Sequence, residues 1–340
     1  MTSDCSLVIR TPAELIAMVP FVMGYHPSDS LAIVGLRGDR LEFAVCHDLP
    51  PPRATDATAQ ELAAGVADAV ARQRVRGAVV VGYGPLKRVT PAALRCAEAL
   101  RRREVTVLDV LRVAGGHWWS YLCGSADCCP AEGRPCLPGD SVIAAEATFR
   151  GQVALPSRAE LTAQVAAVGG AERAEMVRAT ERARRRFGGL LTGDQPARHY
   201  ERLVRQQGQD AVRAAERCYR SGGRLGPDEI AWLGVLLTDR AVEDFALDRV
   251  VPREEWRIRL WTDVLRRVEP PYVAPVACLL GYTAWCAGRG ALARVAVDRA
   301  LAVEPAHQLA GLLHEVLGFG LPPHLVLRGR QRPGRGRRRR

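Results

Sequence analysis

Residues 77–82 are Gly-Ala-Val-Val-Val-Gly, an apolar run that ends in a glycine on each side. Such a run is typical of a strand whose two faces are both covered, as in a parallel sheet. An amphipathic helical pattern at 57–74 precedes it. After it, Thr90-Pro91 is an N-cap with proline at the first helical position, which begins a helix to about Arg103. The stretch therefore predicts a strand between two helices, the repeating unit of an α/β domain.

The rest of the first half continues this alternation. Further strand patterns occur at 5–10, 30–37, 41–46, 104–113 and 153–155, and helix patterns at 11–23 and 141–150. Gly38-Asp39 is typical of a tight hairpin turn, and Thr11 with Glu14 three residues later is typical of a capped helix start. The order βαββαβαβ predicts an α/β domain over residues 1–156. Its mixed sheet has a hairpin on one side and right-handed crossovers elsewhere.

The second half changes character, because strand patterns disappear after residue 157. Amphipathic helical patterns separated by Gly or Pro occur at about 158–167, 171–187, 195–221, 227–240, 252–267, 272–287, 291–303 and 306–318. These patterns predict an all-α domain over residues 157–327. The fold class expected from the whole sequence is an α/β N-terminal domain with a mixed sheet, followed by an all-α C-terminal domain.

One stretch of the second half has tetratricopeptide-like spacing. Leu280-Gly281, Ala293, Ala300 and Pro305 occupy the small and apolar positions of that repeat. No second copy follows at the expected offset, and a solenoid normally needs at least about three repeats. Two interpretations stay open: a single helical hairpin with close-packed small residues, or a helical groove that binds a protein partner.

The net charge of +11 comes mostly from the last residues. Residues 328–340 hold eight arginines and no acid, so the other residues together carry only +3. A segment of Arg, Gly, Pro and Gln cannot build a core and is expected to be disordered. We expect it to attract nucleic acid weakly and without sequence preference through the phosphates. The alternative is an incidental, solubilising extension.

The sequence predicts a cytoplasmic protein without membrane segments. Its first residues have neither the basic nor the apolar region of a secretion signal, and the apolar stretch 273–288 is interrupted by proline and glycine. Cysteines should therefore be reduced. Cys46, Cys96, Cys278 and Cys286 are isolated in apolar stretches, where a free cysteine behaves as a small hydrophobic residue.

Residues 117–136, here called the Trp-Cys loop, carry the densest chemistry of the chain. The spacing Cys123-x4-Cys128-Cys129-x6-Cys136 is at the loose end of zinc knuckles. The adjacent pair Cys128-Cys129 is expected to point its two side chains apart. Three interpretations stay open: a zinc site, a packed cysteine-rich loop, or a disulfide formed under oxidation.

A set of four metal ligands could be completed in several ways. Cys136 and His117 lie within the same loop, and His26 or His47 could be brought near by folding.

The aromatic residues of the loop suggest recognition. Trp118 and Trp119 are adjacent, so on a strand they face opposite ways, one into the core and one into a groove. Alternatively, the following loop covers both.

Residues 24–30, here called the His26 loop, place His26 close to Asp29 and Ser30. Such neighbours seldom align as a catalytic triad, whose members usually come from separated segments. His26 stays a candidate general base or ligand, because loops between core elements tend to carry function. The candidate ligand-binding residues are His26, Asp29, Ser30, Trp118, Trp119 and Tyr121.

Several motifs together resemble a known family. They are Thr-Pro-Ala-Glu-Leu at 11–15, the segment from Gly24 to Leu31, Leu-Arg-Val at 111–113, Trp-Trp-Ser-Tyr-Leu-Cys at 118–123 and Cys-Cys-Pro at 128–130. The chain resembles the actinobacterial family catalogued as domain of unknown function 4192. The resemblance implies a cytoplasmic bacterial protein with an α/β N-terminal part and a helical C-terminal part, and it implies no activity. Cys136 departs from the family pattern, which favours His26, Cys123, Cys128 and Cys129 as the metal ligands.

Taken together, these patterns predict a non-enzymatic cytoplasmic protein that binds a ligand or regulates a partner. The His26 loop and the Trp-Cys loop would form the recognition surface, and the helical domain would be a platform for a protein partner. The alternative is an enzyme that uses a cysteine nucleophile, or a metal bound by Cys and His, in the same cleft. The only cofactor indicated is zinc.

Overall fold

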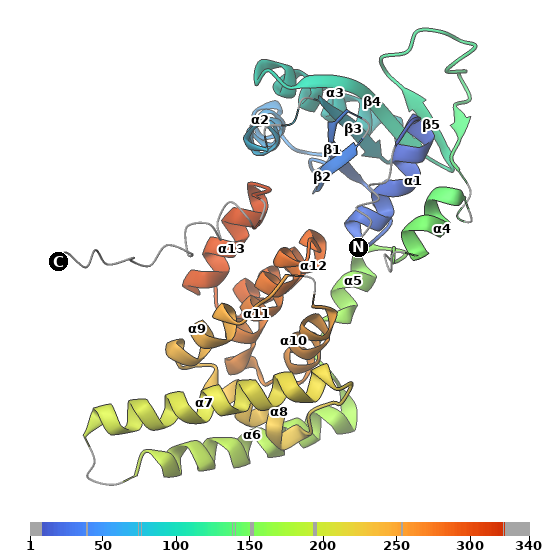
Figure 1. The fold of residues 1–340 in the computed structure, drawn as a ribbon. Helices are drawn as coiled ribbons and strands as arrows, with labels where there is room; N and C mark the ends of the chain where they lie inside the picture. Colours follow the sequence, from blue (N-terminus) through green and yellow to red (C-terminus); the bar gives the residue numbers. More distant parts are fainter. Residues whose placement is uncertain are drawn as a thin grey trace, which may run out of the picture. The chain divides into compact units, whose positions relative to one another are not determined.

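The structure, a computed structural model, describes residues 9–38, 40–73, 75, 77–137, 139, 141–149, 153–192, 196–252, 254–321 and 323. The chain forms two compact units, Met1–Glu160 with Gly318–Arg340, and Leu161–Leu317. We call them the α/β unit and the helical unit (Figure 1). Most of the strand predicted at 5–10 and the whole Arg-rich segment 328–340 lie outside the described residues.

The α/β unit is built on one mixed sheet. Its strands are β1 (Ser30–Arg37), β2 (Arg40–Asp48), β3 (Gly77–Tyr83), β4 (Thr106–Ala114), β5 (His117–Ser120) and β6 (Arg134–Pro135). They lie in the order β2-β1-β3-β4-β5-β6. Strands β3 and β4 are parallel and the other neighbouring pairs are antiparallel. The predicted mixed sheet and the predicted hairpin, in which Arg37 pairs with Arg40, are both confirmed.

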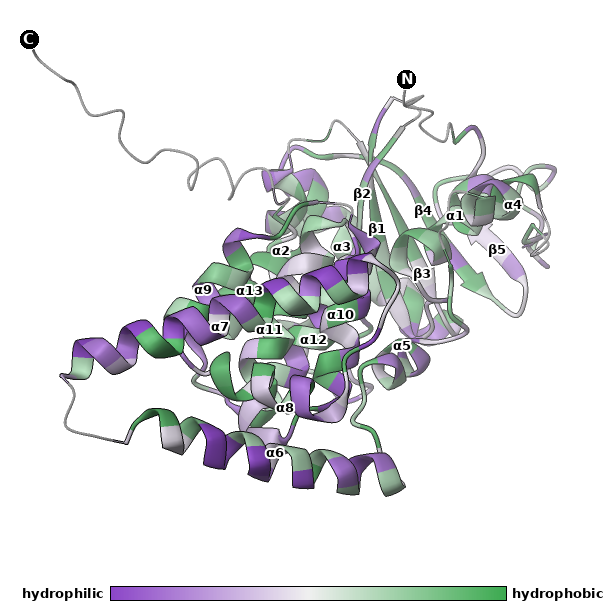
Figure 2. Cartoon of the chain, turned by 60° about the horizontal axis from the view of Figure 1, so that its bottom comes forward, coloured by the Kyte–Doolittle hydropathy of each residue, from purple (hydrophilic) through white to green (hydrophobic). Residues whose placement is uncertain are grey.

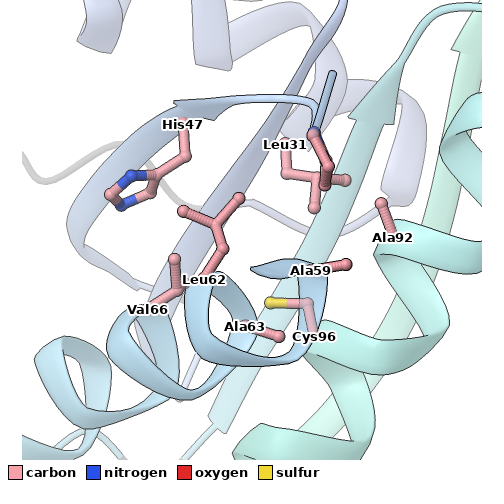
Figure 3. Close-up of a pocket in the computed structure, with 9 residues that line it drawn as sticks. Leu31, His47, Ala59, Leu62, Ala63, Val66, Ala92 and Cys96 are labelled. Atoms are coloured by element: carbon pink, nitrogen blue, oxygen red, sulfur yellow. The ribbon is translucent and has the colours of Figure 1, made fainter. Parts of the chain in front are cut away.

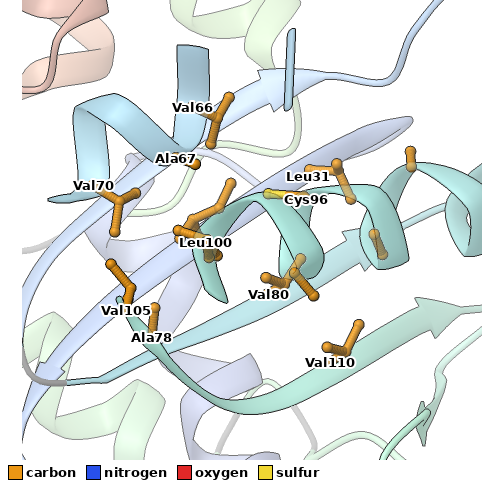
Figure 4. Packing of buried hydrophobic residues seen from close by; sticks show 14 of the residues in the cluster. Leu31, Val66, Ala67, Val70, Ala78, Val80, Cys96, Leu100, Val105 and Val110 are labelled. Atoms are coloured by element: carbon orange, nitrogen blue, oxygen red, sulfur yellow. The ribbon is translucent and has the colours of Figure 1, made fainter. Parts of the chain in front are cut away.

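Helices cover the two faces of this sheet (Figures 1 and 2). They are α1 (Pro12–Met23), α2 (Asp56–Arg72), α3 (Leu86–Arg102) and α4 (Val142–Phe149). The main core lies under α2 and α3, where Val66 and Leu100 meet Ile33 and Val80 of the sheet (Figure 4). A smaller cluster joins α1 to α4 on the other side. Since both faces are covered, β3 is buried along its whole length, as its apolar sequence predicts.

The start of α3 differs from the prediction. The helix begins at Leu86 with Pro85 as N-cap, one turn before the predicted start at Thr90-Pro91. Pro91 is therefore the sixth residue of the helix, inside it, where a proline cannot donate the backbone hydrogen bond to the residue four positions earlier. The extra turn places Val89 against the backbone of Gly82, where an added Cβ would lie 2.2 Å from Val89 Cγ1. Tertiary packing of Val89 therefore extends the helix beyond the capping signal.

The helical unit follows the predicted pattern with one exception. Its helices are α5 (Arg158–Gln164, which begins in the α/β unit), α6 (Gly170–Leu190), α7 (Ala197–Arg220), α8 (Pro227–Leu236), α9 (Arg240–Asp248), α10 (Glu255–Arg267), a 3₁₀ turn η1 (Pro270–Tyr272), α11 (Val273–Cys286), α12 (Gly290–Val303) and α13 (Gln308–Gly318). The helix predicted at 227–240 ends at Leu236, and it is followed by a second helix, α9, which was not predicted. Asp239 begins the second, because its side chain accepts hydrogen bonds from the amides of Ala241 and Val242.

Helix α11 is the centre of the helical unit, since all of its residues are buried. Figure 2 shows it as largely hydrophobic, in contrast to the mixed surfaces of α6 and α7. It packs against α12 at Gly281, where an added Cβ would lie 2.8 Å from Val297 Cγ2. The predicted close-packed helical hairpin is therefore present. A tetratricopeptide-like groove for a partner stays a prediction.

After α13 the chain returns to the α/β unit. The guanidinium of Arg72 lies 4.4 Å from the ring centroid of Phe319, and Gln73 Nε2 donates a hydrogen bond to the carbonyl of Gly320. The α/β unit is thus assembled from two separate parts of the chain. Among the described helices, none is long and apolar enough to cross a membrane.

Candidate functional site

The two tryptophans of the Trp-Cys loop lie on β5, which pairs with β4 so that Val113 faces Trp118 and Arg112 faces Trp119. Because side chains alternate along a strand, the two indoles lie on opposite faces of the sheet. Trp118 is 6% exposed and Trp119 is half-buried. The two rings therefore differ in environment, one in the core and one at the surface.

The ring of Trp119 is covered by the protein itself. The Arg112 guanidinium lies 3.7 Å from the ring centroid. The indole N–H donates a 3.0 Å hydrogen bond to the carbonyl of Ala131. Gly133 lies so close that an added Cβ would be 2.5 Å from Trp119 Cε2. These contacts give Trp119 a structural role in holding the loop, which corresponds to the alternative that the following loop covers the tryptophans.

Three cysteines of the loop converge. The Sγ atoms of Cys123, Cys128 and Cys129 all lie within 4.8 Å of one another. Cys123 and Cys129 are half-buried and Cys128 is exposed. A single cluster of soft donor atoms is therefore present at the surface of the α/β unit.

A single helical turn brings the side chains of Cys128 and Cys129 together. The amide of Cys129 donates to the carbonyl of Ser125 at 2.8 Å, an i to i+4 bond. Adjacent side chains on a helical turn differ in direction by about 100° rather than by the 180° of a strand. The expectation that Cys128 and Cys129 point apart is therefore wrong, because it assumed an extended backbone.

The first cysteine is positioned from the sheet. The Ser120 hydroxyl donates to Asp109 Oδ1 at 2.6 Å, and it accepts the amide of Cys123 at 3.1 Å. Asp109 belongs to β4, so the start of the cysteine segment is attached to a strand. A cluster held from a rigid element keeps its geometry better than one on a free loop.

Arg134 holds the other end of the segment and was not identified from the sequence. Its guanidinium donates to the carbonyls of Cys128 and Asp127, the latter at 3.2 Å. It reaches them because Arg134 on β6 pairs with Trp118 on β5. No local spacing signals this contact, since it depends on the pairing of two short strands.

The thiols of Cys123 and Cys129 differ in acidity. The pKa of Cys123 is lowered, chiefly by a hydrogen bond from the Ser125 amide and then by hydrogen bonds from the thiols of Cys129 and Cys128. Burial raises the pKa of Cys129 to about 11, and the neighbouring Cys123 adds to the rise. Cys123 is therefore more acidic than Cys129, and the thiolate of Cys123 accepts hydrogen bonds from the neighbouring thiols.

The remaining ligand candidates lie outside this group. None of His26, His47, His117 and Cys136 has a donor atom within 4.8 Å of all three sulfurs. The Cys136 amide instead donates to Gly116 at 2.8 Å, and burial raises the pKa of the Cys136 thiol.

The structure does not bring the His26 loop to the cysteines. His26 is exposed, and its amide donates to the carbonyl of Leu155 at 2.8 Å. Ser30, four residues later, is separated from Trp118 by three strand spacings, or about 14 Å.

Within the His26 loop the three candidate residues have different surroundings. Asp29 has a positive φ of 45° and accepts a 2.6 Å hydrogen bond from Arg88. Ser30 is buried at the start of β1, whereas His26 is exposed. A further candidate, Tyr121, shares a 2.6 Å hydrogen bond with Thr90 and packs against the main core. Asp29 and Tyr121 thus have structural partners.

A separate apolar pocket lies between β1, β2, α2 and α3 (Figure 3). Aliphatic side chains such as Leu31, Leu62 and Val66 line it, with Cys96 at its base and His47 at its edge. Burial raises the pKa of the Cys96 thiol to about 12, so this sulfur stays protonated. The pocket therefore lacks the reactive groups that the cysteine cluster has.

The comparisons with known proteins identify the family. A family model described as a domain of unknown function (DUF4192) matches residues 12–324. The chain belongs to the DUF4192 family. The match covers the His26 loop, the Trp-Cys loop and the helical unit, so the resemblance noted in the sequence extends over nearly the whole chain. Searches of curated proteins and of solved structures gave no match. The DUF4192 assignment thus adds no chemistry to the cysteine cluster.

Proposed function

We propose that this chain is a cytoplasmic binding or regulatory protein whose Trp-Cys loop holds one zinc ion on Cys123, Cys128 and Cys129. The observation that carries the proposal is the convergence of the three sulfurs within 4.8 Å. Zinc with Zn–S bonds of about 2.3 Å and tetrahedral angles needs sulfurs about 3.8 Å apart. Small rotations about the side-chain bonds therefore suffice to close the site.

The surroundings of the cluster also support a metal. Zinc binds thiolates, and the hydrogen bond from the Ser125 amide lowers the pKa of Cys123, which favours its thiolate form. All of the described cysteines are free, which suits a reducing compartment such as the cytoplasm. Three protein ligands leave one tetrahedral position open, and a water molecule or a donor group of the bound ligand or partner would occupy it.

The same geometry favours a second candidate, a cysteine nucleophile at Cys123. A thiolate that accepts hydrogen bonds from an amide and from two thiols is poised to attack an electrophile. Cys129 would then be the neighbouring thiol that resolves a mixed disulfide, since its sulfur lies within 4.8 Å. This candidate requires the cluster to be free of metal.

Two partner proposals accompany the site. The helical unit would bind a protein partner, and the Arg-rich residues 328–340 would hold nucleic acid weakly and without sequence preference. Deletion of 328–340 should abolish retention of the chain on a nucleic-acid column at low salt. Unchanged retention, with the same dependence on salt, would show that the tail is not the basic surface.

The decisive experiment is metal analysis of the purified full chain by mass spectrometry. Cys128→Ser should lower the zinc content by about one ion per chain relative to the native sequence. Cys286→Ala is the matched control, because Cys286 is a buried cysteine of α11 and should leave the zinc content unchanged.

Two further results decide between the candidates. His26→Ala should leave the zinc content unchanged, because His26 lies outside the sulfur group. If Cys128→Ser loses no zinc and one fast-reacting thiol disappears on Cys123→Ser, the nucleophile replaces the metal site.

A further inference from the structure

A second group of metal-binding side chains lies in the helical unit. Glu243 belongs to α9, Cys278 to α11, and His307 directly precedes α13. One donor atom from each lies within 4.8 Å of the other two. The Sγ of Cys278 is 3.5 Å from Nδ1 of His307. Three separate segments thus bring an oxygen, a sulfur and a nitrogen to one point.

The carboxylate of Glu243 lacks the partner that its burial demands. Its Oε1 atom is buried and has no hydrogen-bond partner among the described residues. A buried carboxylate oxygen without a donor is costly, and native proteins normally satisfy such an atom with a side chain, a water molecule or an ion. Burial and then the nearby Asp244 raise the pKa of Glu243 to about 7, and Arg240 offsets only part of this rise.

Charges of both signs lie near the group, since Asp244 and Glu304 raise the pKa of Glu243 and Arg240 lowers it. Cys278 is fully buried, and burial raises its pKa, with further contributions from the charges of Glu243 and Glu304. Glu304 also acts on Glu243 in the same direction. A cation at this point would supply the partner that the buried Oε1 of Glu243 lacks.

The tautomer of His307 suits a metal ligand. The amide of Ala310 donates to His307 Nδ1 at 3.3 Å, which requires a lone pair on that nitrogen. The proton of the neutral imidazole is then on Nε2, and the single lone pair of Nδ1, which lies 3.5 Å from Cys278 Sγ, would turn from the Ala310 amide to bind a metal. The 3.3 Å bond is long, so it competes weakly with a metal.

We propose that Glu243, Cys278 and His307 form a second zinc site, which joins α9, α11 and the start of α13. Thiolate and imidazole ligands select zinc over magnesium or calcium, and a carboxylate is a common third ligand. The site lies wholly within the helical unit and does not depend on the function proposed for the Trp-Cys loop. A resident ion would stabilise the helical unit by linking its central helix to two neighbours.

The test uses the full-length protein with Cys123→Ser and Cys128→Ser, which remove the zinc site proposed in the Trp-Cys loop. This background should retain about one zinc ion per chain, and adding His307→Ala should remove it. His314→Ala is the matched control, since His314 lies on the same α13 and pairs with Asp298 instead. A background without zinc, or zinc retained in the His307 variant, would overturn the second site.

Cobalt titration covers the case in which a variant folds poorly. Co²⁺ added to the metal-free background should give a thiolate-to-cobalt absorption band, which Cys278→Ala removes and Cys286→Ala keeps. Glu243→Gln conserves shape and should weaken Co²⁺ binding by about tenfold or more. A background that folds but shows no thiolate band would also overturn the site.

The metal contents of the single variants separate the two proposals. Zinc lost only with Cys128→Ser supports the Trp-Cys site alone, and zinc lost only with His307→Ala supports the helical site alone.

Discussion

The indole N–H of Trp119 donates a 3.0 Å hydrogen bond to the carbonyl of Ala131. This bond links β5 to the far side of the segment that carries Cys128 and Cys129. The sheet therefore holds the cysteine cluster from both ends, through Trp119 on one side and through Ser120 on the other.

Gly133→Ala tests this attachment. Gly133 has a φ of 81°, and an added Cβ would lie 2.5 Å from the Trp119 ring, so the variant must displace the indole or the loop. We expect a loss of about 1–3 kcal/mol in the free energy of unfolding, together with faster labelling of the loop thiols. Gly124→Ala is the matched control, because nothing lies within 4 Å of its added Cβ. Equal effects of the two substitutions would contradict the role of Trp119.

Glu216→Gln should be among the most destabilising single changes in the helical unit. Glu216 is 2% exposed and pairs with Arg257, which is 3% exposed, and with Arg249. Removing the carboxylate breaks a buried ion pair and leaves Arg257 with only Glu254 as an ionic partner among the described residues, which costs about 3–5 kcal/mol. The surface pair of Glu98 and Arg102 provides the control. Glu98→Gln should change the free energy of unfolding in urea by less than about 1 kcal/mol.

Asp263 should make the helical unit sensitive to acid. Burial alone would raise the pKa of Asp263, but hydrogen bonds from Arg224, Tyr219 and Arg267 outweigh it and hold the pKa below its usual value. A carboxyl with a lowered folded-state pKa stabilises the fold above its unfolded pKa of about 3.9. That stabilisation is lost as the pH falls through the folded-state pKa.

Asp263→Asn should therefore lower the free energy of unfolding at neutral pH by about 2 kcal/mol and flatten its decline below about pH 4. Urea unfolding at a series of pH values measures both effects. Asp210→Asn removes an exposed carboxyl of α7 and is the control. An unchanged acid dependence in the Asp263 variant would exclude this network as the source.

Glu243→Gln should affect the metal-free and the zinc-bound protein in opposite directions. With a chelator present, the variant should be more stable by about 1 kcal/mol, because a buried carboxylate oxygen without a partner is replaced by a neutral group. With zinc, the native sequence should melt at the higher temperature, because it keeps all three ligands. Glu315→Gln on the exposed side of α13 should show neither effect. Destabilisation of equal size with and without zinc would argue against a metal at Glu243.

Local signals predicted most of the fold. The capping box of Thr11 and Glu14 is present as predicted, and α1 begins at Pro12, directly after the N-cap residue Thr11. The apolar sequence that predicts β3 and the turn sequence that predicts the hairpin of β1 and β2 are local signals too. The start of α3 was missed because the burial of Val89 against Gly82 outweighs a good capping signal at Thr90.

The candidate sites likewise differ in whether a local sequence pattern reveals them. Cys123, Cys128 and Cys129 lie within a few residues of one another, so their chemistry could be recognised before their geometry was known. Cys278 lies in an apolar helix, and its sequence context indicates only a buried hydrophobic residue. Glu243 lies 35 residues before Cys278, and His307 lies 29 residues after it. No local sequence pattern therefore predicts that the three side chains converge.

The contact between Arg72 and Phe319 affects the order in which the chain can fold during synthesis. Multidomain chains generally complete their N-terminal domain first, as it leaves the ribosome. Here the α/β unit emerges first, but its second part, which begins at Gly318, is synthesised only after the whole helical unit. The end of α2 must wait for Phe319 and Gly320, so the last unit to be completed is the one that was begun first.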